Sequence, residues 1–151
     1  MSRALLAILF SISALLPQED CAGTEGGSSV CLGFSGIDPD AGTLDITYSS
    51  LNPVAGFQFN LTGIDILSAE SGVLNIYTGS GTGFVMGFID PGSGEYLPPA
   101  DGGVLMSVSF EIGPETSACI TNPIVSGVGG VSYPPELPDC ATVPEGPKDC
   151  E

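Results

Sequence analysis

The sequence predicts an all-β protein, an antiparallel β-sandwich of about eight to nine strands in a single domain. Short segments with alternating apolar and polar residues are typical of half-buried strands. Clusters of turn-forming residues separate these segments, and the 151 residues include 22 Gly and 13 Pro. Beyond residue 29, no segment shows helical periodicity over a useful length. A chain of this length fits one domain.

The first 29 residues carry the features of a targeting segment. Arg3 precedes a 13-residue run without charge, Ala4–Leu16, and acidic residues follow it. This run has the length of a signal-peptide core and is too short to span a membrane. A short buried N-terminal helix is the alternative. We therefore expect a signal peptide over residues 1–17, a flexible acidic leader over 18–29, and a protein that is secreted, extracellular or at the cell surface.

The first half of the domain contains the clearest alternation. The first strand is expected at Val30–Phe34. A second strand has Leu44, Ile46 and Tyr48 on one face and polar residues between them. In a third strand, apolar residues at 55, 57, 59 and 61 alternate with Gly56, Gln58, Asn60 and Thr62. These apolar faces are the predicted core.

The second half of the domain contains shorter or less regular strands. Residues 84–89 are apolar on both faces, as in a central strand. Pro123 interrupts 118–125, which predicts an edge or bulged strand. Turns are expected at 79–83 and 90–94, where Gly and Pro occupy suitable positions. The remaining expected strands are 64–67, 73–77, 104–112 (Val104, Met106, Val108, Phe110 and Ile112 on one face) and 141–143. The domain spans 30–143, and 144–151 is a tail or linker.

All five cysteines follow the predicted signal, where an oxidising compartment favours disulfides. We favour a Cys119–Cys140 bridge, which closes a proline-rich loop, and expect Cys21–Cys31 as the second. Cys150 is then spare, and it is a candidate for an intermolecular bond. The sequence alone leaves other pairings open. A zinc site is disfavoured, because the chain has no C-x-x-C motif and no His.

The net charge of −16 restricts the classes of partner. Nucleic-acid binding and docking on anionic lipid both need Lys and Arg, and the chain has two such residues. No segment after the predicted signal is apolar enough to span a bilayer. The acids are interpreted first as a solubility feature. Asp38, Asp40 and Asp45 are a candidate structural Ca²⁺ site, although their spacing departs from an EF-hand loop. No other cofactor is expected.

Catalysis is not expected. Without His, no imidazole-based triad can form. Glycoside hydrolysis needs two carboxylates across a cleft. The sequence offers Glu70, Glu95 and Glu111 without a dense acidic cluster.

Four tyrosines and no Trp limit the options for stacking on sugars. Tyr48 and Tyr77 follow the strand pattern and are expected in the core. Tyr96 and Tyr133 lie beside proline-rich loops and are the candidates for sugar stacking at the surface. They are the basis of an alternative function, a carbohydrate-binding module.

Two stretches carry a resemblance to a family. The segment PVAGFQFNLTG at 53–63 resembles an early strand of cohesin-like domains, and GVLMSVSFEIG at 103–113 looks like a strand near their end. The resemblance covers roughly residues 30–125. It implies a nine-stranded jelly-roll sandwich, related to some carbohydrate-binding modules, that binds dockerin partners or acts as a non-catalytic surface module. We therefore expect a module for protein–protein interaction, self-assembly or cell-surface assembly.

Overall fold

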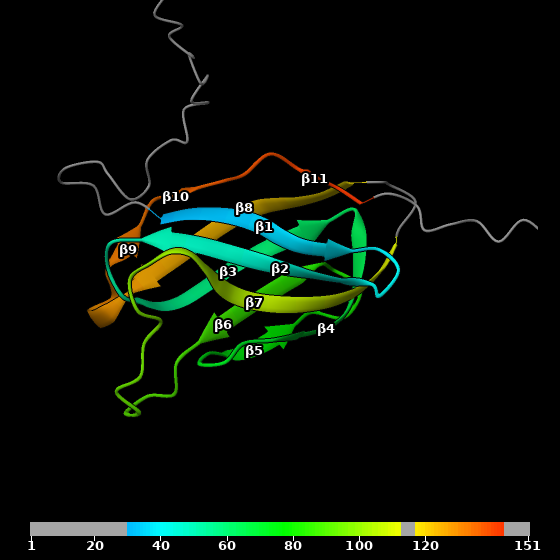
Figure 1. Ribbon diagram of the computed structural model, residues 1–151. Helices are drawn as coiled ribbons and strands as arrows, with labels where there is room; N and C mark the ends of the chain where they lie inside the picture. Colours follow the sequence, from blue (N-terminus) through cyan, green and yellow to red (C-terminus); the bar gives the residue numbers. More distant parts are fainter. Residues whose placement is uncertain (1–29, 113–116, 144–151) are drawn as a thin grey trace, which may run out of the picture.

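The computed structural model describes residues 30–112 and 117–143, which form a β-sandwich of two sheets (Figure 1). The first sheet has the strand order β10-β1-β2-β7-β4, and the second has β11-β8-β3-β6-β5 with β9 beside β8. The all-β sandwich expected from the sequence is confirmed. The elements are β1 Val30–Asp38, β2 Thr43–Ser50, β3 Val54–Thr62, β4 Ile64–Glu70, β5 Asn75–Thr78, β6 Phe84–Phe88, β7 Ala100–Ile112, β8 Ser117–Gly127, the 3₁₀ turn η1 Val128–Gly130, β9 Ser132–Tyr133, β10 Pro135–Glu136 and β11 Ala141–Thr142.

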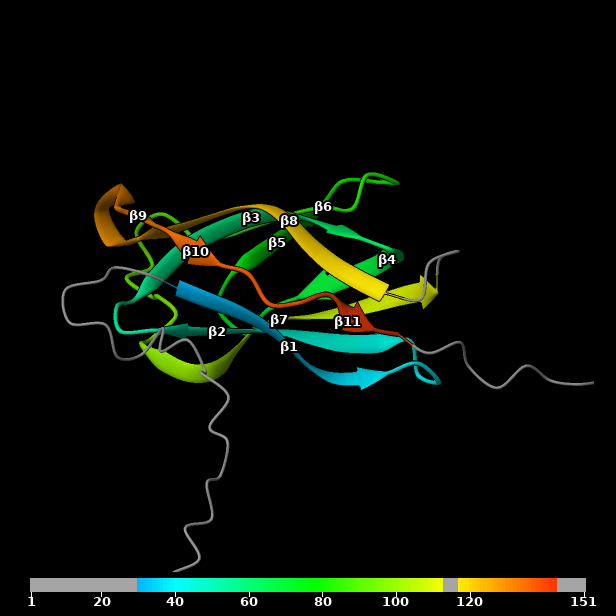
Figure 2. The same cartoon turned by 90° about the horizontal axis from the view of Figure 1, so that it is seen from above.

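The core lies between the two sheets, which face each other as separate layers in Figure 2. The alternation read from the sequence places the inner side chains of β2 correctly, and those of β3 from Phe57 onward. At the start of β3, where the register with β8 shifts, Val54 is buried and Ala55 is only partly buried. In β2, Leu44, Ile46 and Tyr48 are buried while their polar neighbours are partly exposed. In β3, Phe57 and Phe59 stack with ring centroids 5.2 Å apart. Leu61 completes the buried row of this strand.

The alternation predicted for β7 fails at its start. Val104 is 52% exposed, whereas Leu105 and Met106 are both buried. The cause is a β-bulge: Ile46 pairs with Met106, but the next residue, Thr47, pairs with Val104. The extra residue, Leu105, shifts the inward phase of the strand by one position. From Met106 onward the predicted inner face is correct.

The bulge expected at Pro123 is present. Gln58 pairs with Ile124 and Asn60 with Thr121, so Asn122 and Pro123 together oppose one residue of β3. Asn122 has a φ of 50°. Asn tolerates this left-handed conformation better than most residues, and Pro123 has no N–H to leave unpaired. The sequence therefore breaks the ladder where the strand bends.

The chain after β8 closes one side of the sandwich. We call residues 131–143 the strap. It pairs with β8 through β9, crosses to β1 through β10, and returns to β8 through β11 (Figure 2). The sequence predicts only its last strand, because its prolines give no strand pattern. Two buried side chains anchor it, Tyr133 near its start and Val143 at its end.

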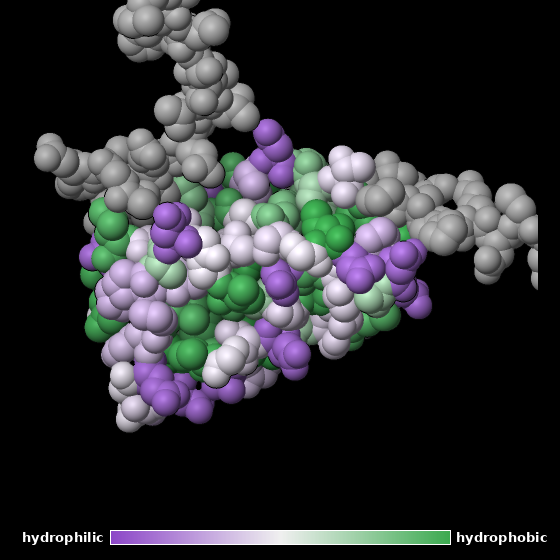
Figure 3. All heavy atoms as spheres, viewed as in Figure 1, coloured by the Kyte–Doolittle hydropathy of each residue, from purple (hydrophilic) through white to green (hydrophobic). Residues whose placement is uncertain are grey.

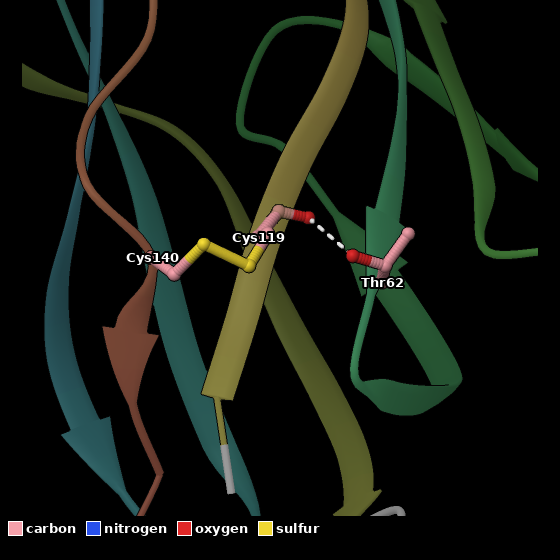
Figure 4. Close-up of a disulfide and its surroundings, with 3 residues drawn as sticks. All are labelled: Thr62, Cys119 and Cys140. Atoms are coloured by element: carbon pink, nitrogen blue, oxygen red, sulfur yellow. Dashed lines mark hydrogen bonds between the residues drawn. A yellow bond between two sulfur atoms is a disulfide. The ribbon is translucent and has the colours of Figure 1, made fainter. Parts of the chain in front are cut away.

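A disulfide fixes the strap to β8. Cys119 of β8 is bonded to Cys140, the pair that the sequence favours (Figure 4). The Thr62 hydroxyl donates to the carbonyl oxygen of Cys119 at 3.4 Å, next to the bond. Cys31 is also disulfide-bonded. Its expected partner Cys21 lies outside the described residues, as do Cys150, the predicted signal and leader, and the predicted tail. No helix in 30–112 or 117–143 is long and apolar enough to cross a membrane.

Removing the Cys119–Cys140 bond is expected to destabilise the domain. The bond closes a loop with a sequence separation of 21. For a loop of that size, the loss of chain entropy in the unfolded state corresponds to about 3 kcal/mol. The double variant Cys119→Ser with Cys140→Ser should lower the free energy of unfolding by this amount in equilibrium urea titrations. An unchanged midpoint would show that the strap is held without the bond.

We expect Tyr48 to make the stability of the domain sensitive to alkaline pH. Its hydroxyl donates to the Pro98 carbonyl at 2.6 Å, and burial raises the pKa of the phenol above its ordinary value of 10.0. The folded state therefore prefers the neutral phenol more than the unfolded state does. The associated stability is present below pH 10 and is lost as pH rises through the higher pKa of the folded state.

Urea titrations between pH 8 and 11 should show this loss. Tyr48→Phe should cost about 1 kcal/mol at pH 8, because a hydrogen bond is removed. Its free energy of unfolding should then fall less steeply above pH 10 than that of the parent protein. Parallel pH profiles for the two proteins would show that Tyr48 does not contribute to the alkaline loss.

Candidate functional site: the outer face of the second sheet

The outer face of the second sheet presents a row of side chains that crosses four strands. Strand pairing places Ile124 of β8 beside Gln58 of β3, Gln58 beside Met86 of β6, and Met86 beside Tyr77 of β5. Ile124 is 52% exposed and Tyr77 is 54% exposed, while Gln58 and Met86 are partly exposed. The register of the sheet thus gathers apolar groups from distant parts of the chain.

A second row runs parallel to the first. Gly56 of β3 lies between Ser126 of β8 and Phe88 of β6, and Phe88 pairs with Asn75 of β5. Phe88 and Tyr77, which belong to adjacent rows, stack with centroids 5.2 Å apart and planes at 5°. We call these two rows the β8–β3–β6–β5 face.

Gly56 leaves a depression in the middle of this face. A cavity of about 170 Å³ is lined by Gly56, Phe57, Gln58, Met86, Gly87, Phe88, Ile124 and Ser126. A Cβ atom at position 56 would lie 3.1 Å from the Gly87 carbonyl oxygen and 3.2 Å from Ser126 Oγ. A side chain there would fill the floor of the depression. Glycine therefore keeps a small apolar hollow open between half-exposed side chains.

The two sheets differ in the charge of their outer sides. None of the residues in the two rows of the β8–β3–β6–β5 face is charged at neutral pH. In the first sheet, by contrast, cross-strand pairs join Asp45 to Ser107, Ser107 to Glu70, and Asp65 to Glu111. Figure 3 shows one side of the molecule, where hydrophilic residues are scattered among pale and hydrophobic ones. In a chain of net charge −16, an uncharged sheet face is a distinct feature.

The structure corrects the roles expected for the tyrosines. Tyr77 is exposed, because the short edge strand β5 turns Ile76 inward and Tyr77 outward. Tyr133, expected at the surface, is buried at 6% exposure, and its hydroxyl donates to the Pro53 carbonyl at 3.4 Å. Tyr96 is partly exposed. Tyr96 and Tyr133 therefore do not form an exposed stacking pair. Phe88, the second aromatic residue on this face after Tyr77, was not predicted at the surface, because residues 84–89 are apolar on both sides of the strand. Phe88 is partly exposed.

Asp38, Asp40 and Asp45, the candidate Ca²⁺ ligands, do not form a metal-binding cluster in the structure. Asp38 Oδ1 accepts hydrogen bonds from the backbone N–H groups of Asp40 and Ala41, both at 3.0 Å, which closes the β1–β2 turn. Asp45 accepts the Ser107 hydroxyl at 2.7 Å on the neighbouring strand. Across 30–112 and 117–143, no three Asp, Glu, Cys or His residues gather as a metal ion would require. The carboxylate of Asp38 therefore stabilises a turn, and that of Asp45 links two neighbouring strands.

A larger cavity lies beside the bulge of β7. Its volume is about 480 Å³, and its lining contains the single carboxylate of Glu70 among mainly apolar and serine side chains. Hydrolysis of a glycoside requires two carboxylates on opposite sides of the bond. This cavity is lined by one carboxylate, that of Glu70, and so lacks the pair.

The architecture is similar to that of solved cohesins. The sixth cohesin of scaffoldin B from Acetivibrio cellulolyticus, solved with a Cel5 dockerin, aligns with a TM-score of 0.52 and 15% identity over 72% of this chain and 95% of that chain. The solution structure of CaCohA2 from Clostridium acetobutylicum aligns with a TM-score of 0.53 and 17% identity over 78% of this chain and 92% of its own. CaCohA2 in complex with CaDoc0917 gives a TM-score of 0.53 and 16% identity, over 77% of this chain and 100% of that chain.

No protein-family model matches the sequence, and no curated protein matches it. The similarity therefore rests on the arrangement of the strands. This arrangement was also implied by the stretches at 53–63 and 103–113, which form β3 and most of β7. The chain has the fold of a cohesin-like domain.

Proposed function

We propose that this protein is a secreted, non-catalytic module that binds another protein through the β8–β3–β6–β5 face. The observation that carries the proposal is a contiguous, uncharged and partly apolar face on a strongly acidic chain. Ile124, Met86 and Phe88 keep apolar surface in contact with water on this face. An apolar surface of this kind marks a site of association.

The composition of the face suits a protein interface. Aromatic residues and Met are enriched at the centres of such interfaces, where charged residues are depleted. Tyr77, Phe88 and Met86 are held on paired strands, so binding would order little backbone. The hollow above Gly56 is large enough for one side chain of a partner. Anchors of this kind contribute most of the affinity at many interfaces.

The solved structures support a protein partner. Two of the similar chains were solved as complexes, one with a Cel5 dockerin and one with CaDoc0917. The fold similarity alone does not transfer these partners to a chain that is 15–16% identical. Secretion is supported by the sequence of residues 1–17 and by the Cys119–Cys140 bond, because disulfides persist in oxidising compartments.

Charge favours a partner different from the protein itself. Two copies would each bring a net charge of −16 to a shared interface. Repulsion between like charges opposes such a pair, most strongly at low ionic strength. A partner with a neutral or basic rim around an apolar anchor avoids this repulsion. Self-assembly through the face is therefore the weaker interpretation.

The test compares charge insertion on the two outer sides of the sandwich. Met86→Glu and Ile124→Glu place a carboxylate on the proposed face, and Ser68→Glu places one on an exposed position of β4 in the first sheet. The immobilised protein captures a partner from the culture medium of the source organism. That partner is then purified, and its binding is measured by calorimetry. Burying an unpaired charge at a hot spot should weaken binding by at least about 30-fold.

The control variant Ser68→Glu shows whether a loss of binding is specific to the proposed face. Ser68→Glu should bind like the parent protein, and all three variants should keep the thermal midpoint of the parent within a few degrees. If Met86→Glu and Ile124→Glu bind the purified partner as tightly as the parent protein, the face is not the binding site. If no partner binds at micromolar concentration, the protein-binding function itself is wrong.

A further inference from the structure

One corner of the second sheet combines exposed aromatic surface with polar side chains. Tyr77 of β5 stacks in parallel on Phe88 of β6. Asn75, two residues before Tyr77 on the same outer side, pairs across the strands with Phe88. The Asn75 amide donates to Asp90 Oδ1 at 2.8 Å, just beyond the end of β6. Four groups from two strands and one turn thus meet at the edge of the sheet.

The turn after β6 holds Asp90 in place. The N–H of Ser93 donates to the Asp90 carbonyl at 3.1 Å, and Gly92 has a φ of 91°. Pro at the second position and a positive φ at the third define a type II turn. The turn fixes the backbone of Asp90, and the bond from Asn75 fixes its carboxylate. The polar groups of this corner are therefore ordered before any ligand arrives.

We infer that this corner is a binding subsite for a neutral carbohydrate. The apolar face of a pyranose ring packs on the Tyr77 ring, which is 54% exposed and supported from behind by Phe88. The amide of Asn75 and the carboxylate of Asp90 together offer donors and acceptors to sugar hydroxyls. Tyr presents an apolar ring face together with a polar hydroxyl, a combination that matches the mixed surface of a sugar.

The negative charge of the protein favours neutral glycans over anionic ones. Asp90 places an exposed carboxylate beside the aromatic pair, where Asn75 holds it, and the whole chain carries a net charge of −16. Uronic-acid and sulfated polysaccharides would be repelled at this corner. A neutral glycan is not repelled, and its hydroxyls can donate to the carboxylate. The proposed ligand is therefore a neutral polysaccharide.

This subsite shares Tyr77 and Phe88 with the proposed protein-binding face, but Ile124 belongs to the face alone, so the two proposals can be tested separately. Tyr77 and Ile124 lie at opposite ends of one cross-strand row, three strand spacings apart. At about 4.8 Å per spacing, the separation is about 14 Å. A change at Ile124 therefore leaves the sugar corner intact. Failure of either proposal can be seen without failure of the other.

Affinity electrophoresis tests the inference with defined polysaccharides. The parent protein should be retarded in gels containing at least one of laminarin, xyloglucan or galactomannan, and not in gels containing polygalacturonate. Tyr77→Ala and Asn75→Ala should each raise the dissociation constant obtained from the retardation at least about tenfold, because a stacking or hydrogen-bonding partner of the ligand is removed. Tyr77→Phe keeps the ring and should retain most of the binding.

Two control variants distinguish the loss of stacking at Tyr77 from a general loss of polysaccharide binding. Ile124→Glu and Tyr96→Ala should bind polysaccharide like the parent protein, and thermal melts should show that Tyr77→Ala remains folded. The inference is overturned if none of the three neutral polysaccharides retards the protein. It is also overturned if Tyr77→Ala binds as the parent does, or if polygalacturonate retards the protein equally well.

Discussion

The register of β3 is the constraint on which the rest of the structure depends. Phe57, Phe59 and Leu61 point into the core, whereas Gln58 points outward and Gly56 lies on the outer face just before Phe57. A shift of one residue would expose the whole apolar row, at a cost of about 1.5–3 kcal/mol for each large side chain. Burial of the inner row therefore also fixes the outer row. Because β6 and β8 take their register from β3, the core determines the geometry of the candidate face.

The two outer sides of the sandwich differ in charge. Acids and serines cover much of the first sheet, whose pairs include Asp45 with Ser107 and Asp65 with Glu111. The uncharged rows lie on the second sheet, so the proposed binding face avoids unpaired charges that would need to be desolvated on binding. The surrounding negative charge then acts at longer range and disfavours anionic ligands and copies of the protein itself.

The strap explains how a sandwich with open edges stays closed. Its three strands have two residues each, and its prolines cannot donate to a ladder. Buried Tyr133 and Val143 and the Cys119–Cys140 bond supply what the short ladders lack. The strap also pairs with part of the edges of β1 and β8, where the backbone groups would otherwise be open to other chains.

The fold class, the inner faces of β2 and of most of β3, and the break at Pro123 could be predicted from the sequence, because period-two burial and proline chemistry are local. The sequence favoured the Cys119–Cys140 pair but left other pairings open. It misplaced Val104, Tyr77 and Tyr133. A bulge, an edge strand and the closure of the strap decided these positions. The candidate site was not readable, because Ile124, Gln58, Met86 and Tyr77 come from four strands. Only the pairing of those strands makes them neighbours. Tertiary structure therefore decided the site, since alternation identifies a strand's faces but not which strands lie side by side.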